Sequence, residues 1–460
     1  MLGFVGRRAE LDLLERTAKT KGSALVPIWG RRRVGKSELI LRFTRERPAL
    51  YLVGKTAPAA LQLAEFLREA ARLLDEPLLV ELPRDDWKRA LGEVVKRWRG
   101  PEKLVIALDE FQWLVQASPE LPSVIQELWD REWQKSGKIM LILCLSFVGF
   151  MEREVLGKKS PLFGRRSAQI HLGPFGYREA AEFFPGWSRL ERTRAYFVTG
   201  GVPMYLRAFD THRSVEQNIA DVVLDAFGVL HHEPDFLLRE ELREVESYYA
   251  VLLSVAEGLG TAPEIAKRSG LPERSLHYYL NQLVELGYLA RRYPVTGKPP
   301  APRHVRVRLE DALLRFWFRF VFPNLSRVGR SSSRDALRQI VLPELDAYFG
   351  ECFERLCREA LPFLYAREGV SAEYEVGQYW DKQVQIDVVG YRRDGWTDIG
   401  ECKWGSVRSE RALVAELETK VARYPHATNR TLCRRVFVRQ SPKQRSESVR
   451  WHDLDDLYAD

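Results

Sequence analysis

The chain has 460 residues, of which 45% are hydrophobic and 29% are charged. This length corresponds to about three domains, and the hydrophobic fraction excludes wholesale disorder. The net charge is +8, from 71 Lys and Arg against 63 Asp and Glu, which permits contact with polyanions without requiring it. The longest strongly apolar run, 139–148, is about half of what spans a bilayer, so no membrane partner is expected. The five cysteines form no CxxC pair, and we expect reduced thiols in a cytoplasmic protein.

Four segments follow one another along the chain. Up to about residue 185, short apolar runs alternate with amphipathic helical patterns, which favours an α/β domain with a parallel sheet. A helical stretch, a helix-turn-helix unit and, after the polar linker 326–334, a second α/β segment come next. The predicted domains are 1–185, 186–240, 241–325 and 326–460, and the predicted strands of the first are 24–29, 49–54, 104–108, 139–145 and 167–172.

Residues 30–37 read GRRRVGKS and match the P-loop pattern GxxxxGK[ST]. The motif follows an apolar run and opens a helical pattern, which is the context a P-loop requires. Its glycines let backbone N–H groups surround phosphate at a helix N-terminus. We expect Lys36 to reach the β- and γ-phosphates of ATP and Ser37 to ligate Mg²⁺; the alternative is a chance Gly-Lys-Ser in a basic loop. The predicted nucleotide-binding residues here are Gly30, Arg31, Arg32, Arg33, Val34, Gly35, Lys36, Ser37 and Glu38.

A second apolar strand ends in two carboxylates, Asp109 and Glu110. We expect Asp109 to hold the magnesium ion through water and Glu110 to orient and deprotonate the attacking water. Solvated acids capping an ordinary strand are the alternative, which the order and spacing of the two motifs disfavour. Ser146 follows the strand 139–145, where a γ-phosphate sensor and a turn-forming serine are equally compatible with the pattern.

Several segments together carry a family resemblance. The chain over about residues 1–235 resembles the archaeal-type ATPases, in the STAND-related branch of the AAA+ superfamily. The resemblance implies a P-loop core followed by a helical lid, with Phe4 and Val5 near the adenine and Pro203 where other AAA+ proteins place a sensor arginine. It leaves open whether the chain forms a nucleotide-dependent homo-oligomer, and whether Arg165 or Arg166 acts as an arginine finger or is solvated. The segments are Phe4-Val5-Gly6-Arg7, the P-loop, Asp109-Glu110, Gly164-Arg165-Arg166 and Thr199-Gly200-Gly201-Val202-Pro203.

The third segment predicts a winged helix-turn-helix. Helices are expected at 248–257 and 272–286, with a capping box at Thr261 and Glu264 between them and two wing strands at 288–293 and 305–308. Packing between domains is the alternative use of such a unit. If the unit binds DNA, the exposed part of the second helix presents Arg274, His277, Tyr278 and Asn281. The side chains of the wing that would contact DNA phosphates are Arg291, Arg292, Lys298 and Arg303.

The last segment contains two acidic strands around Arg393-Asp394-Gly395. A two-residue turn places Asp387 and Glu401 on opposite faces, whereas a three-residue loop with Gly395 left-handed pairs 387 with 401 and puts Asp387, Glu401 and Lys403 together. Two carboxylates so placed bind Mg²⁺ or Mn²⁺, and the lysine orients water or stabilises phosphorane charge. A charged hairpin without chemistry is the alternative.

The pattern D-x(13)-E-x-K over about 336–440 resembles the PD-(D/E)xK nuclease core and the uncharacterised domain that often follows archaeal-type ATPases. The resemblance implies a restriction-endonuclease-like α/β fold, in which an acid from an earlier helix completes the site. Glu354 is our choice for that acid and Glu351 is the runner-up, and a solvated helix face is equally compatible with either. Lys420 reads as a surface lysine or a phosphate contact.

The leading hypothesis is an ATP-hydrolysing, DNA-associated protein with a metal-dependent nuclease domain. The rival is a STAND-like, ATP-gated regulatory or scaffold switch whose C-terminal domain binds DNA or partners without cleavage. A helicase-like motor is a weaker third hypothesis, because the sequence shows no aromatic and basic loop that tracks a strand.

Overall fold

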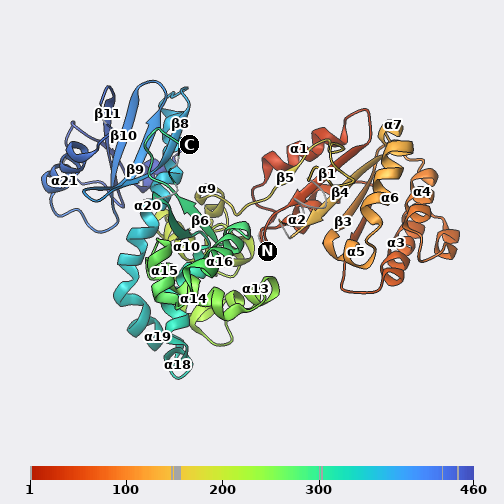
Figure 1. Ribbon diagram of the computed structural model, residues 1–460, viewed down its shortest axis with the longest axis horizontal. Helices are drawn as coiled ribbons and strands as arrows, with labels where there is room; N and C mark the ends of the chain where they lie inside the picture. The colour runs from red at the N-terminus through yellow and green to blue at the C-terminus, as the bar shows by residue number, and fades with distance from the viewer. Residues whose placement is uncertain are drawn as a thin grey trace. The chain divides into compact units, whose positions relative to one another are not determined.

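The computed structural model describes residues 3–146, 149, 157–299, 301, 304–426, 428–442 and 445–459. The chain divides into two compact units (Figure 1). The first unit comprises Met1–Pro174 with Val202–Met204, and the second comprises Phe175–Gly201 with Tyr205–Asp460. Among the described residues, no helix is long and apolar enough to cross a membrane.

The first unit is built on a parallel sheet with the strand order β2-β3-β4-β1-β5. Helices lie between consecutive strands from β1 to β4, as parallel pairing requires. The strands are β1 (Ala24–Trp29), β2 (Ala49–Val53), β3 (Leu104–Asp109), β4 (Ile139–Leu145) and β5 (Ile170–His171). The helices are α1 (Arg8–Ala18), α2 (Lys36–Thr44), α3 (Ala59–Leu74), α4 (Trp87–Arg97), α5 (Phe111–Ala117), α6 (Leu121–Leu128) and α7 (Gln134–Ser136). All five predicted strands are therefore present, the last one shorter than predicted.

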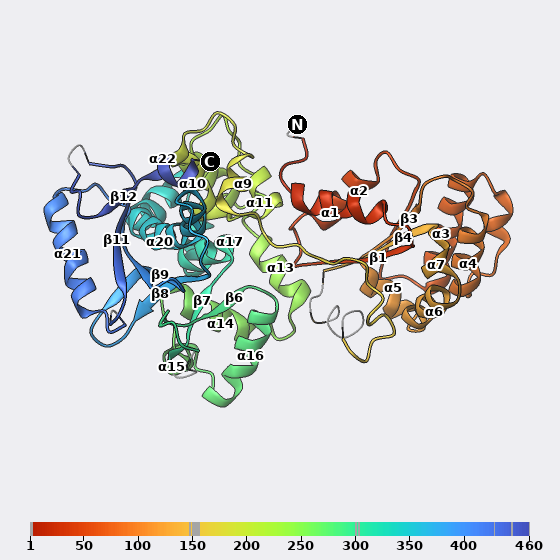
Figure 2. The same cartoon turned by 90° about the horizontal axis from the view of Figure 1, so that it is seen from above.

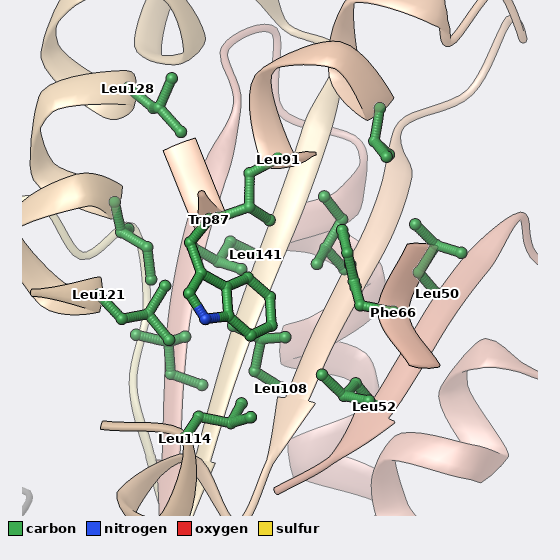
Figure 3. Packing of buried hydrophobic residues seen from close by; sticks show 14 of the residues in the cluster. Leu50, Leu52, Phe66, Trp87, Leu91, Leu108, Leu114, Leu121, Leu128 and Leu141 are labelled. Carbon is green, nitrogen blue, oxygen red and sulfur yellow. The ribbon is translucent and has the colours of Figure 1, made fainter. Parts of the chain in front are cut away.

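Two apolar layers cover the sheet because side chains alternate between its faces. Along β3, Leu104, Ile106 and Leu108 belong to one cluster, whereas Val105 and Ala107 belong to the other. Helices α3 to α6 contribute to the first cluster, part of which is drawn in Figure 3, and α1 and α2 contribute to the second. The buried central strands thus hold their carboxyl ends at one rigid edge.

The second unit begins with short helices and continues into the helix-turn-helix. The short helices are α9 (Tyr177–Ala181), α10 (Arg189–Thr199), α12 (Val215–Asn218) and α13 (Glu233–Glu241), and α11 (Pro203–Arg207) spans the boundary between the units. The helix-turn-helix comprises α14 (Val245–Ala256), α15 (Ala262–Ser269) and α16 (Glu273–Glu285). The Thr261 N–H donates to Glu264 at 2.9 Å, which confirms the predicted capping box. The wing strands β6 (Leu289–Arg292) and β7 (Arg306–Leu309) pair antiparallel.

The C-terminal part of the second unit is a five-stranded mixed sheet of order β12-β11-β10-β9-β8. The long helix α20 (Leu342–Arg367) contacts β8, β9 and β10, and α21 (Glu410–Arg423) packs in the apolar cluster on the sheet with residues such as Ile399. The strands are β8 (Tyr374–Trp380), β9 (Gln385–Arg392), β10 (Trp396–Lys403), β11 (Thr431–Val438) and β12 (Arg450–His452), and α22 (Leu454–Tyr458) follows.

The segment predicted as a linker is partly helical, which corrects that prediction. Helix α18 (Leu325–Val328) and helix α19 (Ser333–Ala336) lie within or overlap 326–334. The Ser332 hydroxyl accepts a hydrogen bond from the Asp335 N–H at 3.2 Å and caps α19. Capping by serine helps a helix to begin in a polar stretch, so polarity alone does not indicate a linker here.

Candidate functional site

The loop between β1 and α2 has the backbone that a P-loop requires. Gly30 has φ of 154°, and a Cβ there would lie 2.0 Å from the Leu172 carbonyl oxygen. Gly35 caps α2 with φ of 89°. The Lys36 ammonium donates to the carbonyls of Gly30 and Arg31, both at 2.9 Å, and burial lowers the pKa of Lys36. A buried cation is thus held inside the loop, where the helix N-terminus also favours anions.

Asp109 lies beside the P-loop serine. The Ser37 hydroxyl donates to Asp109 Oδ2 at 2.5 Å, and the Tyr51 hydroxyl donates to the same oxygen at 2.6 Å. Asp109 is 1% exposed, and its Oδ1 accepts from the Glu110 N–H at 2.8 Å. Burial and the Asp109 charge raise the pKa of Tyr51, so Tyr51 remains a donor. A hydroxyl and a carboxylate in contact are hard oxygen ligands that fit Mg²⁺, with phosphate and water completing its shell.

The Glu110 carboxylate is held through both oxygens. The Ser146 hydroxyl donates to Oε1 at 2.7 Å, and the Gln112 amide donates to Oε2. Glu110 adopts φ of 48° and ψ of 44°, a left-handed conformation that is costly for a residue with a Cβ. The backbone of Gly54 lies close to Glu110, and only glycine permits this, because a Cβ at Gly54 would lie 2.5 Å from the Glu110 carbonyl oxygen. The structure therefore joins Ser146 to the second carboxylate of the strand motif.

The N-terminal motif is tied to the P-loop through Arg7. The Arg7 guanidinium donates to the Val34 carbonyl at 3.1 Å and to the Gly173 carbonyl at 2.5 Å. Arg7 itself has φ of 58°, and Phe4 packs against the core cluster on the α1 and α2 side. Nothing in the local pattern predicts this role of Arg7, since its partners lie far along the chain.

The remaining predicted nucleotide residues surround the loop. Arg31, Arg32, Glu38 and Val5 are half-buried, and Arg33 is exposed with φ of 70°. Pro203 belongs to the segment grouped with the first unit, and its Cγ lies 3.6 Å from the position that a Cβ on Gly35 would take.

The two candidate finger arginines differ in their surroundings. Arg165 donates from Nε and Nη2 to the carboxylate of Asp130 at 2.8 and 2.7 Å. Arg166 is exposed. A bidentate pair fixes the Arg165 guanidinium within its own unit.

The second helix of the helix-turn-helix presents the predicted residues to solvent. Arg274, His277, Tyr278 and Asn281 are all exposed, Tyr278 by 60%. They share one face of α16, whereas Leu276, Leu280 and Leu283 are buried on the other. This face of α16 is therefore accessible to a binding partner, as the recognition helix of a DNA-binding helix-turn-helix must be.

The predicted wing contacts are altered by the fold. Arg292 forms an ion pair with Glu310 at 2.8 Å, and Arg291 donates to Asn281. Lys298 is exposed, and Arg303 lies outside the described residues. The Val295 N–H at the tip of the wing donates to the Gln378 carbonyl of β8 at 2.8 Å. Arg291 and Arg292 are exposed and each also has a partner within the protein, so phosphate binding by these side chains stays a prediction.

The hairpin of β9 and β10 adopts the register of the three-residue loop. Thr397 pairs with Tyr391 and Gly400 with Val388, so Asp387 and Glu401 are the next opposed positions. Gly395 has φ of 90°, as this loop requires. The alternative register, which separates the two acids, is excluded.

Four side chains form what we call the acid cluster: Asp387, Glu401, Glu354 and Lys420. Asp387 and Glu401 are 7% and 5% exposed, and Asp387 accepts from the Cys402 N–H at 3.1 Å. Burial and the Asp387 charge raise the pKa of both Glu354 and Glu401 to about 7. Lys420 forms an ion pair with Glu401. Burial alone lowers the pKa of Lys420, but the Asp387 and Glu401 carboxylates raise it on balance.

The lysine that contacts the acids is therefore not the one in the sequence pattern. Lys403 is exposed at the end of β10, and Glu351 is exposed on α20. Glu354 is half-buried, and the Asp387 charge helps to raise its pKa. Within the part of the chain that the structure describes, no three His, Cys, Asp or Glu side chains are grouped as metal ligands. The carboxylate oxygens suit Mg²⁺ chemically, yet a cation here would need further ligands from substrate or water.

Three segments of the chain match known families. Residues 4–209 match an ATPase domain predominantly from Archaea, and residues 250–292 match the IclR helix-turn-helix domain. Residues 317–447, which include the acid cluster, match a family of archaeal and bacterial proteins of unknown function.

Three of the similar proteins come from archaea. The uncharacterized protein MJECL04 of Methanocaldococcus jannaschii is 28% identical over 411 residues, 88% of each chain. The Walker-type ATPase paby2304 of Pyrococcus abyssi is 19% identical with a TM-score of 0.48, covering 69% of this chain and 96% of that one. The ORC2 protein of Aeropyrum pernix, solved as ADPNP and ADP complexes, is 18% identical with a TM-score of 0.45 over 72% and 94% of the two chains. With the P-loop geometry and the family match together, residues 4–209 are an ATPase domain of the archaeal type, followed by a helix-turn-helix at 250–292.

Proposed function

We propose that the chain is an ATP-hydrolysing protein that binds duplex DNA through α16. The observation that carries the nucleotide half is the contact of Ser37 with Asp109 beside the buried Lys36. When bound, ATP supplies the electrophilic phosphoryl group, and Mg²⁺ supplies positive charge that offsets the negative charge of the phosphates. Lys36 exchanges its two carbonyl contacts for phosphate oxygens, and Glu110 accepts the proton of the attacking water. Ser146 and Gln112 orient the Glu110 carboxylate for that step.

The DNA half rests on the exposed face of α16. Its amino-terminal arginine, its histidine and its asparagine are hydrogen-bonding groups of the kinds that read base edges, and all are exposed. This function follows the IclR-type match at 250–292.

Replacing Arg274 with alanine tests this surface. We expect about ten-fold weaker binding of duplex DNA, since one arginine contact to a base is worth roughly 1–3 kcal/mol. Fluorescence anisotropy at several salt concentrations measures it, and Arg89→Ala, an exposed arginine on α4, is the matched control. An equal loss of DNA affinity in both variants would show a general charge effect and would refute the proposed binding of DNA through α16.

As a second candidate function, we propose that the acid cluster cleaves phosphodiesters with Mg²⁺ or Mn²⁺. The opposed positions of Asp387 and Glu401, their burial and the raised pKa of Glu401 support this candidate. Asp387 and Glu401 would hold the cation, with Glu354 as a further ligand. The structure favours Lys420 over Lys403 as the positive group that steadies the developing charge.

Plasmid cleavage tests the second candidate. Metal binding requires ionised carboxylates, and Glu354 and Glu401 with a pKa of about 7 are largely protonated below that value. Cleavage is therefore expected to rise as the pH passes through about 7, to be lost in Asp387→Asn, and to fall further in Lys420→Ala than in Lys403→Ala. If wild type cuts nothing with either metal, the result favours the rival hypothesis of a switch whose C-terminal domain binds without cleavage.

A further inference from the structure

The tip of the wing is packed into the C-terminal sheet. Val295 is 2% exposed and belongs to the apolar cluster that also contains Tyr379, Ile386 and Leu417. Its N–H donates to the Gln378 carbonyl at 2.8 Å, and Pro294 and Gln378 form a parallel bridge. Strands β6, β7 and β8 are labelled in Figure 2. A wing that only contacted DNA would keep such a valine in solvent.

The C-terminal sheet is shaped to accept the tip. Strand β8 is at the edge of its sheet, and its register shifts between Gly377 and Tyr379. The residue inside that shift, Gln378, is the one whose carbonyl accepts from Val295. Gly377 has no side chain, and a Cβ there would lie 2.6 Å from Val295 Cγ2. An exposed strand edge is normally covered or blunted, and here the wing covers it.

Two further contacts hold the tip. Gly297 has φ of 70°, and a Cβ there would lie 2.2 Å from the ring of Tyr391. Arg430 also contacts that ring, with its guanidinium carbon 3.8 Å from the ring centroid. Arg306, on β7, lies over the Trp380 ring at 4.8 Å. The tip and one strand of the wing therefore face β8 and β9.

We infer that the C-terminal sheet withholds the wing from DNA by binding its tip as an added strand partner of β8. This inference rests on the proposed DNA binding by α16. While the tip is docked, duplex DNA contacts α16 without the phosphate contacts of the wing, and the acid cluster stays fixed relative to the recognition helix. Once the tip is released, Lys298 and its neighbours reach phosphates. Since the released wing adds contacts to DNA, DNA in turn favours release.

Val295→Asp tests the inference, because a carboxylate cannot remain in the apolar cluster. Hydrogen exchange is expected to quicken at 374–380 and at Val295's neighbours in the wing. The dependence of DNA affinity on salt is expected to steepen by about one unit for each phosphate gained. Adding Lys298→Ala should reverse part of that change. Val229→Asp makes the same change at a valine that is 63% exposed and is the matched control.

Gly297→Ala is the second variant designed to release the tip. It places a methyl group against Tyr391 and leaves the residues of the apolar cluster around Val295 intact. Thermal melting of both variants distinguishes release of the tip from unfolding of the sheet. Faster exchange with an unchanged salt dependence would overturn the inference, as would unchanged exchange in both variants. If wild type fails to bind duplex DNA at all, the proposed function fails, while protection of the Val295 N–H still reports docking of the tip.

Discussion

Lys36→Ala is expected to weaken ATP binding and to lower the ATPase rate by about 100-fold to 1,000-fold. The ammonium is the buried cation of the phosphate loop, and losing one preorganised charge in such a site costs about that factor. The same change leaves the Gly30 and Arg31 carbonyls without this donor. Titration of a fluorescent ATP analogue and phosphate release measure the two effects.

Lys19→Ala is the matched control, since Lys19 is an exposed lysine at the end of α1. A thermal melt checks that the Lys36 variant is folded. Unchanged nucleotide affinity in a folded Lys36→Ala protein would contradict the assignment of the loop.

Glu110→Gln is expected to separate binding from hydrolysis. The amide accepts no proton, so kcat should fall by about 100-fold to 10,000-fold while ATP still binds. Asp109, Ser37 and Lys36 remain in place to hold the nucleotide. Single-turnover hydrolysis and equilibrium binding measured on the same preparation give the two quantities.

Glu120→Gln makes the same change at an exposed position that precedes α6. It should leave both quantities at their wild-type values. A Glu110→Gln protein that hydrolyses ATP as fast as wild type would remove Glu110 from the mechanism and leave Asp109 as the acid to examine.

Local sequence signals predicted the elements that carry the nucleotide site. The P-loop motif with Gly30 and Gly35 predicted a loop that opens a helix, and the apolar run before Asp109 predicted a strand. Ser146 was placed correctly at a strand end, but its contact with Glu110 depends on how β3 and β4 pair. Tyr51 and Gln112 carried no signal, and Arg7 was noted only within the Phe4–Arg7 motif without its role, because each acts through a partner that only the folded unit brings close.

The second unit shows the same limit over longer distances. Two registers of the hairpin around Gly395 were compatible with the sequence, and the observed pairing of Thr397 with Tyr391 selects one. Lys420 reads as a surface lysine on its helix, yet the packing of α21 on the sheet brings it to Glu401. Val295 lies in a proline-containing tip that reads as a loop, and its partner Gln378 is more than 80 residues further along the chain.

Phosphate release from ATP is the most direct test of the central claim that the first unit hydrolyses nucleotide. Wild type, Lys36→Ala and Glu110→Gln are compared at equal concentration with Mg²⁺, with and without duplex DNA. We predict turnover by wild type that a chelator abolishes and that both variants lack. Full turnover by the Lys36→Ala protein, with or without DNA, would contradict the account.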